Sequence, residues 1–344
     1  MIMVYLKWLS LRKSFCQLTQ FLLWISGRTK IKSILRSTNI MKPAKVEHFG
    51  IQRKIVSNMT SQSWQEIPHA GPVVEFDVTD LMAQFNILRE SGKLKNKLSI
   101  NTLMLKAIAI ALKESPRMNA HLEFNRHLVR GQLKLFDEVH FSIPMQLPNG
   151  EMMTINCHNF ESKTLDEMTE YMMDVSRRLK NTNLTEAMFE VSMDNTITAL
   201  KKGKIKTVLC RLVGAKTGKH KIKTLSGKAK KEYLSIPESD RITKKDIEQG
   251  TITVSNLGSV DRGRVGHCAI LEIIPPQTSV IALYAATDKP VVVVNDKGEK
   301  EIAIRTILPM TILFDHRACE YSDLLGFINK IQDICDHPEQ IMEW

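Results

Sequence analysis

The residues with the clearest capacity for chemistry are grouped at residues 310–323, "MTILFDHRACEYSD". An apolar, strand-like run ends there, and Asp315, His316 and Arg317 follow directly. Glu320 comes four residues after the histidine. Imidazole exchanges protons near neutral pH, so His316 is either a catalytic acid–base group or a hydrogen-bonded structural residue. The residues alone leave both interpretations open.

A polar group also stands at the end of another strand-like run, "GTITVSNLGS" at residues 250–259. Ser255 and Asn256 follow the alternating apolar residues and precede a glycine. Taken alone, Ser255 is typical of a turn or a cap. His69, in "IPH", is most simply a structural residue.

Hydrophobic periodicity predicts the elements that must position these groups. We expect a strand and then a helix at 73–88, with Thr79 or Asp80 as the helix cap. Further elements are predicted in this order: a buried helix at 99–115, a strand at 134–147 with a turn at "LPNGE", an amphipathic helix at 164–180, strands at 278–286 and 289–294, one long strand or two at 301–315, and a helix at 322–336. This order favours a mixed β-sheet with helices on one side.

Composition narrows the class of protein. A chain of 344 residues can form one large α/β domain or two smaller ones. The six cysteines are scattered without C-x-x-C spacing, so neither a zinc site nor a disulfide framework is indicated and no metal is expected. A reducing compartment, the cytoplasm, fits this pattern.

The net charge of +11 comes from two segments that contain no acid. Residues 1–46 carry nine Lys or Arg, and residues 195–231 carry twelve. Without them the rest of the chain has a net charge of −10. The basic balance therefore says little about the main function, and no specific nucleic acid is expected.

We interpret residues 1–46 as a basic extension. Its apolar part, residues 14–26, is shorter than the roughly 20 residues of a membrane span. Three interpretations are open: a transit peptide, which would place the protein in the mitochondrial matrix; a weak secretion signal; or a helix that contacts a membrane surface. Alternatively, it precedes the true start of the protein at Met41.

Seven stretches, in order, carry a family resemblance. They are "QRKIVSNM", "IPHAGPVVEFDVTDLM", "LMLKAIAIALKESPRMNAHLE", "PNGEMMTINCHNFESKTLDEM", "GTITVSNLGS", "IIPPQTSVIAL" and "FDHRACEY". Together they resemble the catalytic domain of the 2-oxoacid dehydrogenase dihydrolipoamide acyltransferases. The resemblance implies an α/β (α+β), chloramphenicol acetyltransferase-like two-layer sandwich with a mixed sheet. It assigns residues 47–344 to an acyltransferase domain, interrupted by a basic insert at about 195–240.

The resemblance also implies a function. Such enzymes move an acyl group between coenzyme A and a dihydrolipoyl thiol. By this resemblance His316 is the general base, Ser255 stabilises the oxyanion, and Glu320 replaces the family's aspartate in the catalytic motif. Asn256 and Arg317 are candidates for binding substrate or coenzyme A, although Arg317 could instead pair with Asp315 as a scaffold for the loop.

The family forms trimers, in which the histidine and the serine come from different chains. A homotrimer or a larger assembly of trimers is therefore implied. No lipoyl or subunit-binding stretch precedes the domain in this sequence, so we expect the lipoyl group to be supplied in trans. A separate lipoyl carrier protein or dehydrogenase components would be the partners.

Several positions depart from the family pattern. Glu320 is one methylene longer than the family's aspartate, and Tyr321 replaces a glycine, which would be strained if a positive φ were needed. Gln52 and Asn58 stand where the family tends to have arginine. The loop after Ser255 is about four residues longer than expected.

These departures keep two alternatives open. One is a chloramphenicol-type acetyltransferase acting on a small hydroxylated molecule. The other is a relative that has lost catalysis and serves as a scaffold. The basic insert is open too: it could bind an acidic carrier domain, the phosphates of coenzyme A, anionic lipid or nucleic acid, or form a solvated flexible loop.

Overall fold

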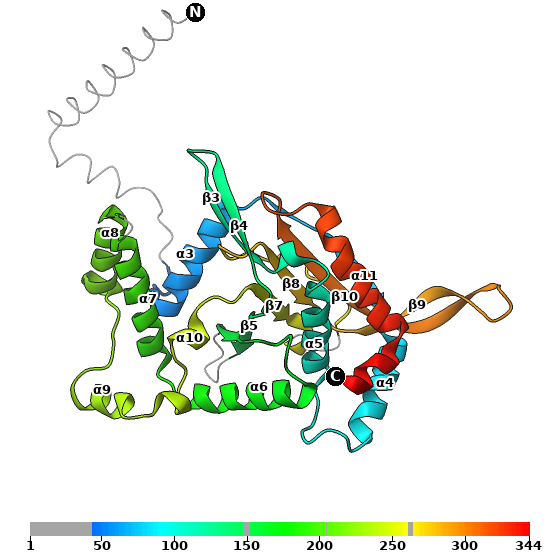
Figure 1. The fold of residues 1–344 in the computed structure, drawn as a ribbon. Helices are drawn as coiled ribbons and strands as arrows, with labels where there is room; N and C mark the ends of the chain where they lie inside the picture. The colour runs from blue at the N-terminus through cyan, green and yellow to red at the C-terminus, as the bar shows by residue number, and fades with distance from the viewer. Residues whose placement is uncertain (1–42, 147–151, 202, 204, 261–263) are drawn as a thin grey trace, which may run out of the picture. The chain divides into compact units, whose positions relative to one another are not determined.

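The computed structural model describes residues 43–344 apart from 147–151, 202, 204 and 261–263. The "LPNGE" turn and most of the N-terminal extension lie outside the described residues. The chain divides into two compact units, Met1–His48 and Phe49–Trp344. The second unit contains every described helix and strand (Figure 1).

A mixed eight-stranded sheet forms the centre of this unit. Its main path runs β1 (His69–Ala70), β10 (Lys300–Asp315), β8 (Ser279–Leu283), β7 (Ile252–Asn256), β5 (Phe141–Gln146) and β6 (Met152–Cys157). β7 pairs in parallel with β5 and β8, whereas the other pairs are antiparallel. The long run at 301–315 is therefore one strand, β10, rather than two.

β10 is also the strand that joins the sheet to a projecting ribbon. β2 (Val73–Asp77) pairs with it at residues 307–311, and β9 (Thr287–Val294) pairs with it at residues 300–307. Figure 1 shows β9 and the first half of β10 extending beyond the body of the domain. A separate hairpin is formed by β3 (Ala120–Asn125) and β4 (Arg130–Leu135).

Helices pack on one face of the sheet and bury the main core. They are α4 (Thr79–Glu90), α5 (Ile100–Leu112), α6 (Leu165–Lys180) and α11 (Leu325–Asp336). Ten of the thirteen residues of α5 are buried, as its nearly all-apolar sequence predicts. α6 begins with a complete capping box between Thr164 and Glu167. The predicted mixed sheet with helices on one side is confirmed.

Two local predictions were wrong. The expected strand at 134–147 is broken: residues up to Leu135 belong to the β3–β4 hairpin, and β5 begins at Phe141. Asn119 causes the break, because its Nδ2 donates to the carbonyls of Phe136 (2.8 Å) and Glu138 (3.0 Å). The N-cap of α4 is Val78, not Thr79 or Asp80; Oδ1 of Asp77, one residue earlier, accepts from the Thr79 amide (3.0 Å).

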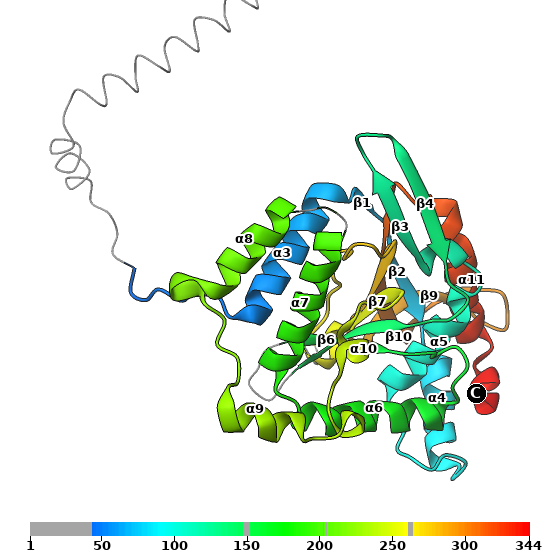
Figure 2. The same cartoon turned by 60° about the vertical axis from the view of Figure 1, so that its left-hand side comes forward.

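The basic segment at 195–240 is largely helical in its described part, which does not fit the alternative of a flexible loop. It contains the end of α7 (Leu184–Lys201), then α8 (Ile205–Lys216) and α9 (Gly227–Leu234). α7 packs against both α8 and α3 (Ile51–Glu66), and Figure 2 shows the three helices side by side. Among the described residues, no helix is both long and apolar enough to span a bilayer.

Candidate active site

His316 directly follows the last residue of β10. Its ring lies edge-on against Phe314, with centroids 5.5 Å apart, and its amide donates to the Pro68 carbonyl (3.0 Å). The side chain is 49% exposed. The backbone is thus fixed on two sides while the imidazole faces solvent in the isolated chain, as a group that must meet a substrate requires.

Glu320 lies close to this imidazole. Its Oε2 is 3.6 Å from Nδ1 of His316, and its side chain is 69% exposed. The separation is longer than a good hydrogen bond, so the pair is weak in its present geometry. With Nδ1 turned toward the carboxylate, Nε2 is the ring nitrogen that can serve as the base.

Asp315 and Arg317 form an ion pair beneath the histidine. The Asp315 carboxylate is fully buried, and it accepts from Nη2 (2.6 Å) and Nε (2.9 Å) of Arg317. It also accepts from the Arg317 amide (3.0 Å). The possibility that these two residues pair with each other is confirmed. The guanidinium also lies over the Phe124 ring, 5.9 Å from its centroid, so Arg317 is already engaged within the protein.

Arg117, which the sequence analysis did not single out, holds the turn after His316. Its Nη1 donates to the Ala318 carbonyl (3.2 Å) and lies 3.7 Å from Oδ2 of Asp323. The Glu320 amide donates to the same Asp323 oxygen (2.8 Å). Tyr321 begins a short 3₁₀ helix, Tyr321–Leu324, and its φ is not positive. The glycine replacement therefore creates no backbone strain.

His69 has the structural role that was expected. Its Nε2 accepts from the Ile273 amide (3.0 Å), so Nδ1 carries the proton and donates to the Ile67 carbonyl (2.9 Å). Ser63 supports the same loop by donating to the Ile273 carbonyl (2.6 Å). These contacts tie the 273 loop to the end of α3, next to the β1–β10 pair.

Ser255 is buried on β7, and other parts of the backbone approach the chain closely at Gly250 before the strand and at Gly258 after it. Its neighbour Thr253, on the same face of the strand, donates to Oε1 of Gln277 (2.6 Å). The glycines two residues beyond each end of β7 have no room for a side chain: a Cβ on Gly250 would lie 2.2 Å from the His140 carbonyl oxygen, and one on Gly258 would lie 2.7 Å from the Ala285 nitrogen. The serine is thus placed by a tightly fitted strand.

Asn256 is engaged within the protein. Its Oδ1 accepts from the Ser259 amide (3.0 Å), and its Nδ2 donates to Asn101 on α5 (2.8 Å). Asn256 therefore shapes the exit of β7. A role for it in binding coenzyme A stays a prediction, as it does for Arg317.

His316 and Ser255 do not meet within one chain. Ser255 pairs with Ala282, and Ala282 pairs with Thr311 of β10. His316 lies five residues beyond Thr311, so we estimate a separation of roughly 19 Å, from about 16 Å along β10 and about 10 Å across the strands. A substrate thioester cannot bridge that distance between a base and an oxyanion donor.

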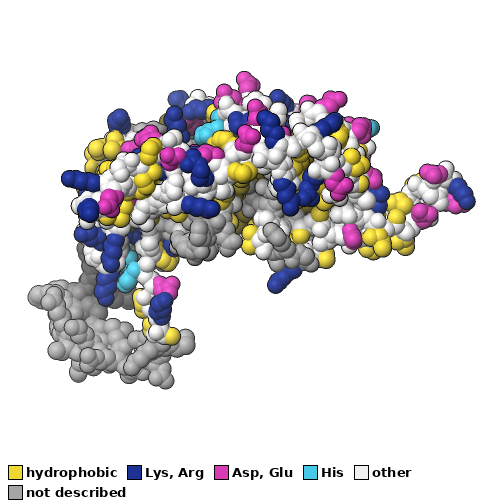
Figure 3. All heavy atoms as spheres, turned by 90° about the horizontal axis from the view of Figure 1, so that it is seen from below, with side chains coloured by type: hydrophobic (Ala, Val, Ile, Leu, Met, Phe, Trp, Pro, Cys, Tyr) yellow, Lys and Arg dark blue, Asp and Glu magenta, His cyan; other side chains and the backbone are white. Residues whose placement is uncertain are grey.

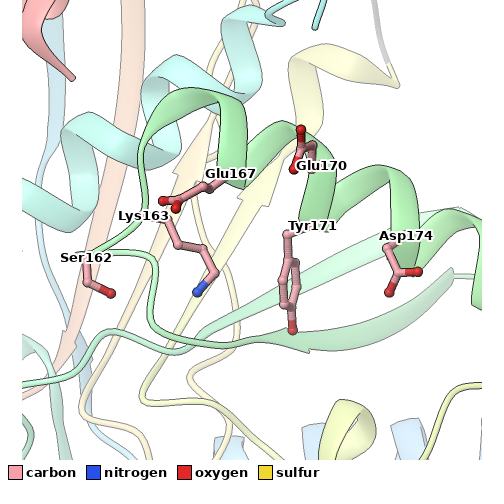
Figure 4. Close-up of a pocket in the computed structure, with 6 residues that line it drawn as sticks. All are labelled: Ser162, Lys163, Glu167, Glu170, Tyr171 and Asp174. Atoms are coloured by element: carbon pink, nitrogen blue, oxygen red, sulfur yellow. The ribbon is translucent and has the colours of Figure 1, made fainter. Parts of the chain in front are cut away.

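A separate hollow of about 510 Å³ lies along α6. It is lined by Ser162, Lys163, Glu167, Glu170, Tyr171 and Asp174 (Figure 4). None of these is a predicted site residue. Within the described ranges, no three His, Cys, Asp or Glu side chains are arranged to hold a metal ion.

Comparison with known proteins identifies the family of this domain. The family model "2-oxoacid dehydrogenases acyltransferase (catalytic domain)" matches residues 41–202 and 217–343. A curated relative, the lipoamide acyltransferase component of the branched-chain alpha-keto acid dehydrogenase complex of Pseudomonas aeruginosa, is 24% identical over 290 residues. The match covers 84% of this chain and 51% of the relative, so this chain spans about half the length of that protein.

Solved structures show the same fold. The cubic core of a pyruvate dehydrogenase multienzyme complex has a TM-score of 0.56 at 18% identity, covering 89% of this chain and 96% of the other. A dihydrolipoamide acetyltransferase from Azotobacter vinelandii, in which the catalytic roles of a serine, a histidine and an asparagine were investigated, has a TM-score of 0.56 at 17% identity and covers 88% of this chain and 94% of its own. The predicted fold class is confirmed, and the unmatched residues 203–216 consist mainly of α8. The chain belongs to the family of 2-oxoacid dehydrogenase acyltransferase catalytic domains.

Proposed function

We propose that this chain transfers an acyl group between coenzyme A and a dihydrolipoyl thiol, using His316 as general base. The observation that carries the proposal is the setting of His316: an exposed imidazole at a strand end, with its backbone held by the ion pair between the buried Asp315 and Arg317. That setting occurs in a chain of the acyltransferase family. Glu320, beside Nδ1, would orient the ring rather than take part in bond making.

The proposed reaction begins with proton transfer from a thiol to Nε2 of His316. The resulting thiolate attacks the thioester carbonyl carbon, and a new C–S bond forms. The carbonyl oxygen becomes an oxyanion, which accepts a hydrogen bond from the Ser255 hydroxyl. The intermediate then breaks its original C–S bond, and the imidazolium returns the proton to the departing thiolate. The base is worth about 10²–10⁴ in rate, and one oxyanion donor about 10²–10³.

We infer that the reacting site is shared between copies of the chain, because a single copy separates His316 from Ser255. A trimer in which these residues come from neighbouring copies is the arrangement proposed. The β9–β10 ribbon supports assembly: Val292, Val294, Ile302 and Ile304 share one face and are 66–76% exposed. Figure 3 shows hydrophobic side chains on the projecting ribbon. An apolar two-stranded ribbon is marginally stable alone and gains stability when another surface covers it.

The lipoyl group is proposed to arrive on another chain, and coenzyme A to act as the second substrate. Neither Asn256 nor Arg317 is used in this mechanism, because both side chains already have partners in the protein.

The test is steady-state release of free coenzyme A thiol from acetyl-, propionyl-, isobutyryl- and succinyl-coenzyme A with dihydrolipoamide. His316→Ala should lower kcat by about 10²–10⁴. His337→Ala is the matched control, because His337 also lies near a carboxylate four residues away, Asp333 at 3.1 Å, and is 65% exposed. The control should retain wild-type activity.

Each result has a definite meaning. Turnover that His316→Ala leaves intact would refute the proposed base. No turnover by a folded wild-type assembly with any of the four donors would refute the dihydrolipoyl reaction. A positive acceptor screen with small hydroxylated molecules would then favour the chloramphenicol-type alternative, and a negative one would favour a scaffold.

A further inference from the structure

α8 presents a row of exposed apolar side chains. Ile205, Leu209 and Val213 recur every four residues and therefore lie along one side of the helix. They are 60%, 58% and 59% exposed, while Val208 is buried against the neighbouring elements. α7, which packs against α8, ends with two further exposed residues, Ile197 (47%) and Leu200 (53%). The rest of the domain therefore covers only part of the apolar surface of α8 and leaves the row Ile205, Leu209 and Val213 exposed.

The helix is fixed in this orientation. Lys54 of α3 donates to the carbonyl of Gly214 (2.9 Å), in the last turn of α8, and to that of His220 just beyond. α7 covers the other side of α8. The exposed row is therefore displayed by a helix with tertiary anchors, not by a segment that could turn the row inward.

Positive charge accompanies the row. Lys206 and Lys216 of α8 are exposed and lie on the same side of the helix as the row, and no acidic residue occurs from 195 to 231. A short helix with an aliphatic side, cationic flanks and no acid has the chemistry of a helix that lies in a membrane interface.

We propose that α8 binds the surface of an anionic lipid bilayer, with its aliphatic row at the acyl-chain boundary and its cations at the lipid phosphates. A bilayer meets both features at once along the whole helix, which is about 18 Å long. Nucleic acid would leave the aliphatic row unused, and α8 offers no aromatic side chain for stacking. An acidic protein would need an apolar groove of matching length.

The sequence offers a second segment of the same chemistry. Residues 1–46 also combine nine basic residues, no acid and an apolar run at 14–26. Stable attachment of a peripheral protein generally takes two weak signals rather than one. The family model leaves residues 203–216 unmatched, so this surface is additional to the family's domain.

The test is flotation of the full chain with lipid vesicles. We expect binding to vesicles that contain phosphatidylglycerol, no binding to pure phosphatidylcholine, and weakening by added salt. Lys206→Ala and Lys216→Ala should each weaken binding by roughly fivefold, because both lie on the side of α8 that carries the aliphatic row. Leu209→Ser/Val213→Ser should weaken it by roughly tenfold or more, because the apolar contact is lost. Ile87→Ser is the matched control, since Ile87 is an exposed aliphatic residue (56%) on a different helix, α4.

Three outcomes would overturn the proposal. The first is no binding of wild type to phosphatidylglycerol vesicles. The second is binding that Leu209→Ser/Val213→Ser leaves unchanged, which would assign attachment to the N-terminal segment. The third is capture on poly-glutamate beads without vesicle binding, which would assign α8 to an acidic protein. Coenzyme A turnover of each variant shows that the domain is folded and is read separately from vesicle binding.

Discussion

Arg317 helps to position His316, because it pairs with Asp315, the residue that directly precedes the histidine. The buried Asp315 carboxylate has the Arg317 guanidinium and amide as partners, and it lies one residue before the histidine. A buried carboxylate that loses its cation keeps its desolvation cost without compensation. Removing Arg317 should therefore destabilise the fold more than removing one partner of an exposed ion pair.

Arg317→Ala should lower the free energy of unfolding by about 3–5 kcal/mol, measured by urea denaturation. Arg305→Ala is the control: Arg305 also makes two close carboxylate contacts, to Asp77 (2.6 Å) and Asp80 (2.7 Å), but those groups are more exposed. Its loss should cost about 1 kcal/mol. Equal costs for the two variants would show that the Asp315 pair has no special structural role.

At the scale of elements, an ion pair ties α6 to α10 (Lys244–Ile247), the short helix that precedes the strand carrying Ser255. Arg178 of α6 donates to both carboxylate oxygens of Asp246, each at 3.0 Å. Burial raises the pKa of Asp246, but the hydrogen bonds from Arg178 and Thr243 outweigh burial and hold the pKa below its usual value of 3.8. The charged form of Asp246 therefore stabilises the fold.

This pair should make stability depend on pH in acid. A carboxyl whose pKa is depressed in the folded state contributes stability above its unfolded pKa and loses it as the pH falls through the folded value. The contribution of Asp246 should thus be complete above about pH 5 and decline below about pH 4. Asp246→Asn should cost about 1.5–3 kcal/mol at pH 7. Urea denaturation from pH 7 to pH 3 should show a smaller loss on acidification in this variant than in wild type, and parallel curves would contradict the assignment.

Elements with a local cause could be predicted from the sequence. The acids at the start of α6 and the bases at its end define that helix, and the apolar run of α5 defines a buried one. The break between β4 and β5 could not be predicted, because Asn119 produces it from a distant part of the chain. α8 was also missed: its lysine-rich sequence reads as solvated, and the contacts with α7 and Lys54 that fix it are not local.

The candidate site shows the same division. His316, Ser255 and Glu320 stand in quotable motifs, so their types and order could be found from sequence. The arrangement around them depends on contacts such as that of Arg117 with Ala318, 201 residues apart in sequence. The 3.6 Å separation between Nδ1 of His316 and Oε2 of Glu320 could not be predicted from the sequence, and neither could the unstrained backbone at Tyr321.

At the scale of the whole molecule, the proposed chemistry needs more than one copy. The pairing of β7, β8 and β10 places Ser255 and His316 at different levels of the sheet. A closed ring can bring the His316 edge of one copy to the Ser255 region of the next. Ile302→Lys/Ile304→Lys, on the exposed face of the ribbon, should then weaken assembly, as measured by sedimentation. Glu301→Lys, whose side chain lies on the opposite face, should weaken it less.

Mixing two inactive variants tests the shared site directly. His316→Ala and Ser255→Ala should each be nearly inactive when prepared alone, because each ring has lost one group at every site. If they are co-expressed in equal amounts and form trimers at random, a site is complete only when one copy provides Ser255 and the appropriate neighbour provides His316. About a quarter of the sites should then be intact, restoring about a quarter of wild-type turnover. Mixing the separately purified, stably assembled variants should restore almost none. Failure of the co-expressed mixture to recover any activity, with normal assembly, would mean that both residues act within one chain. Wild-type activity of Ser255→Ala prepared alone would instead mean that Ser255 has no part in the reaction.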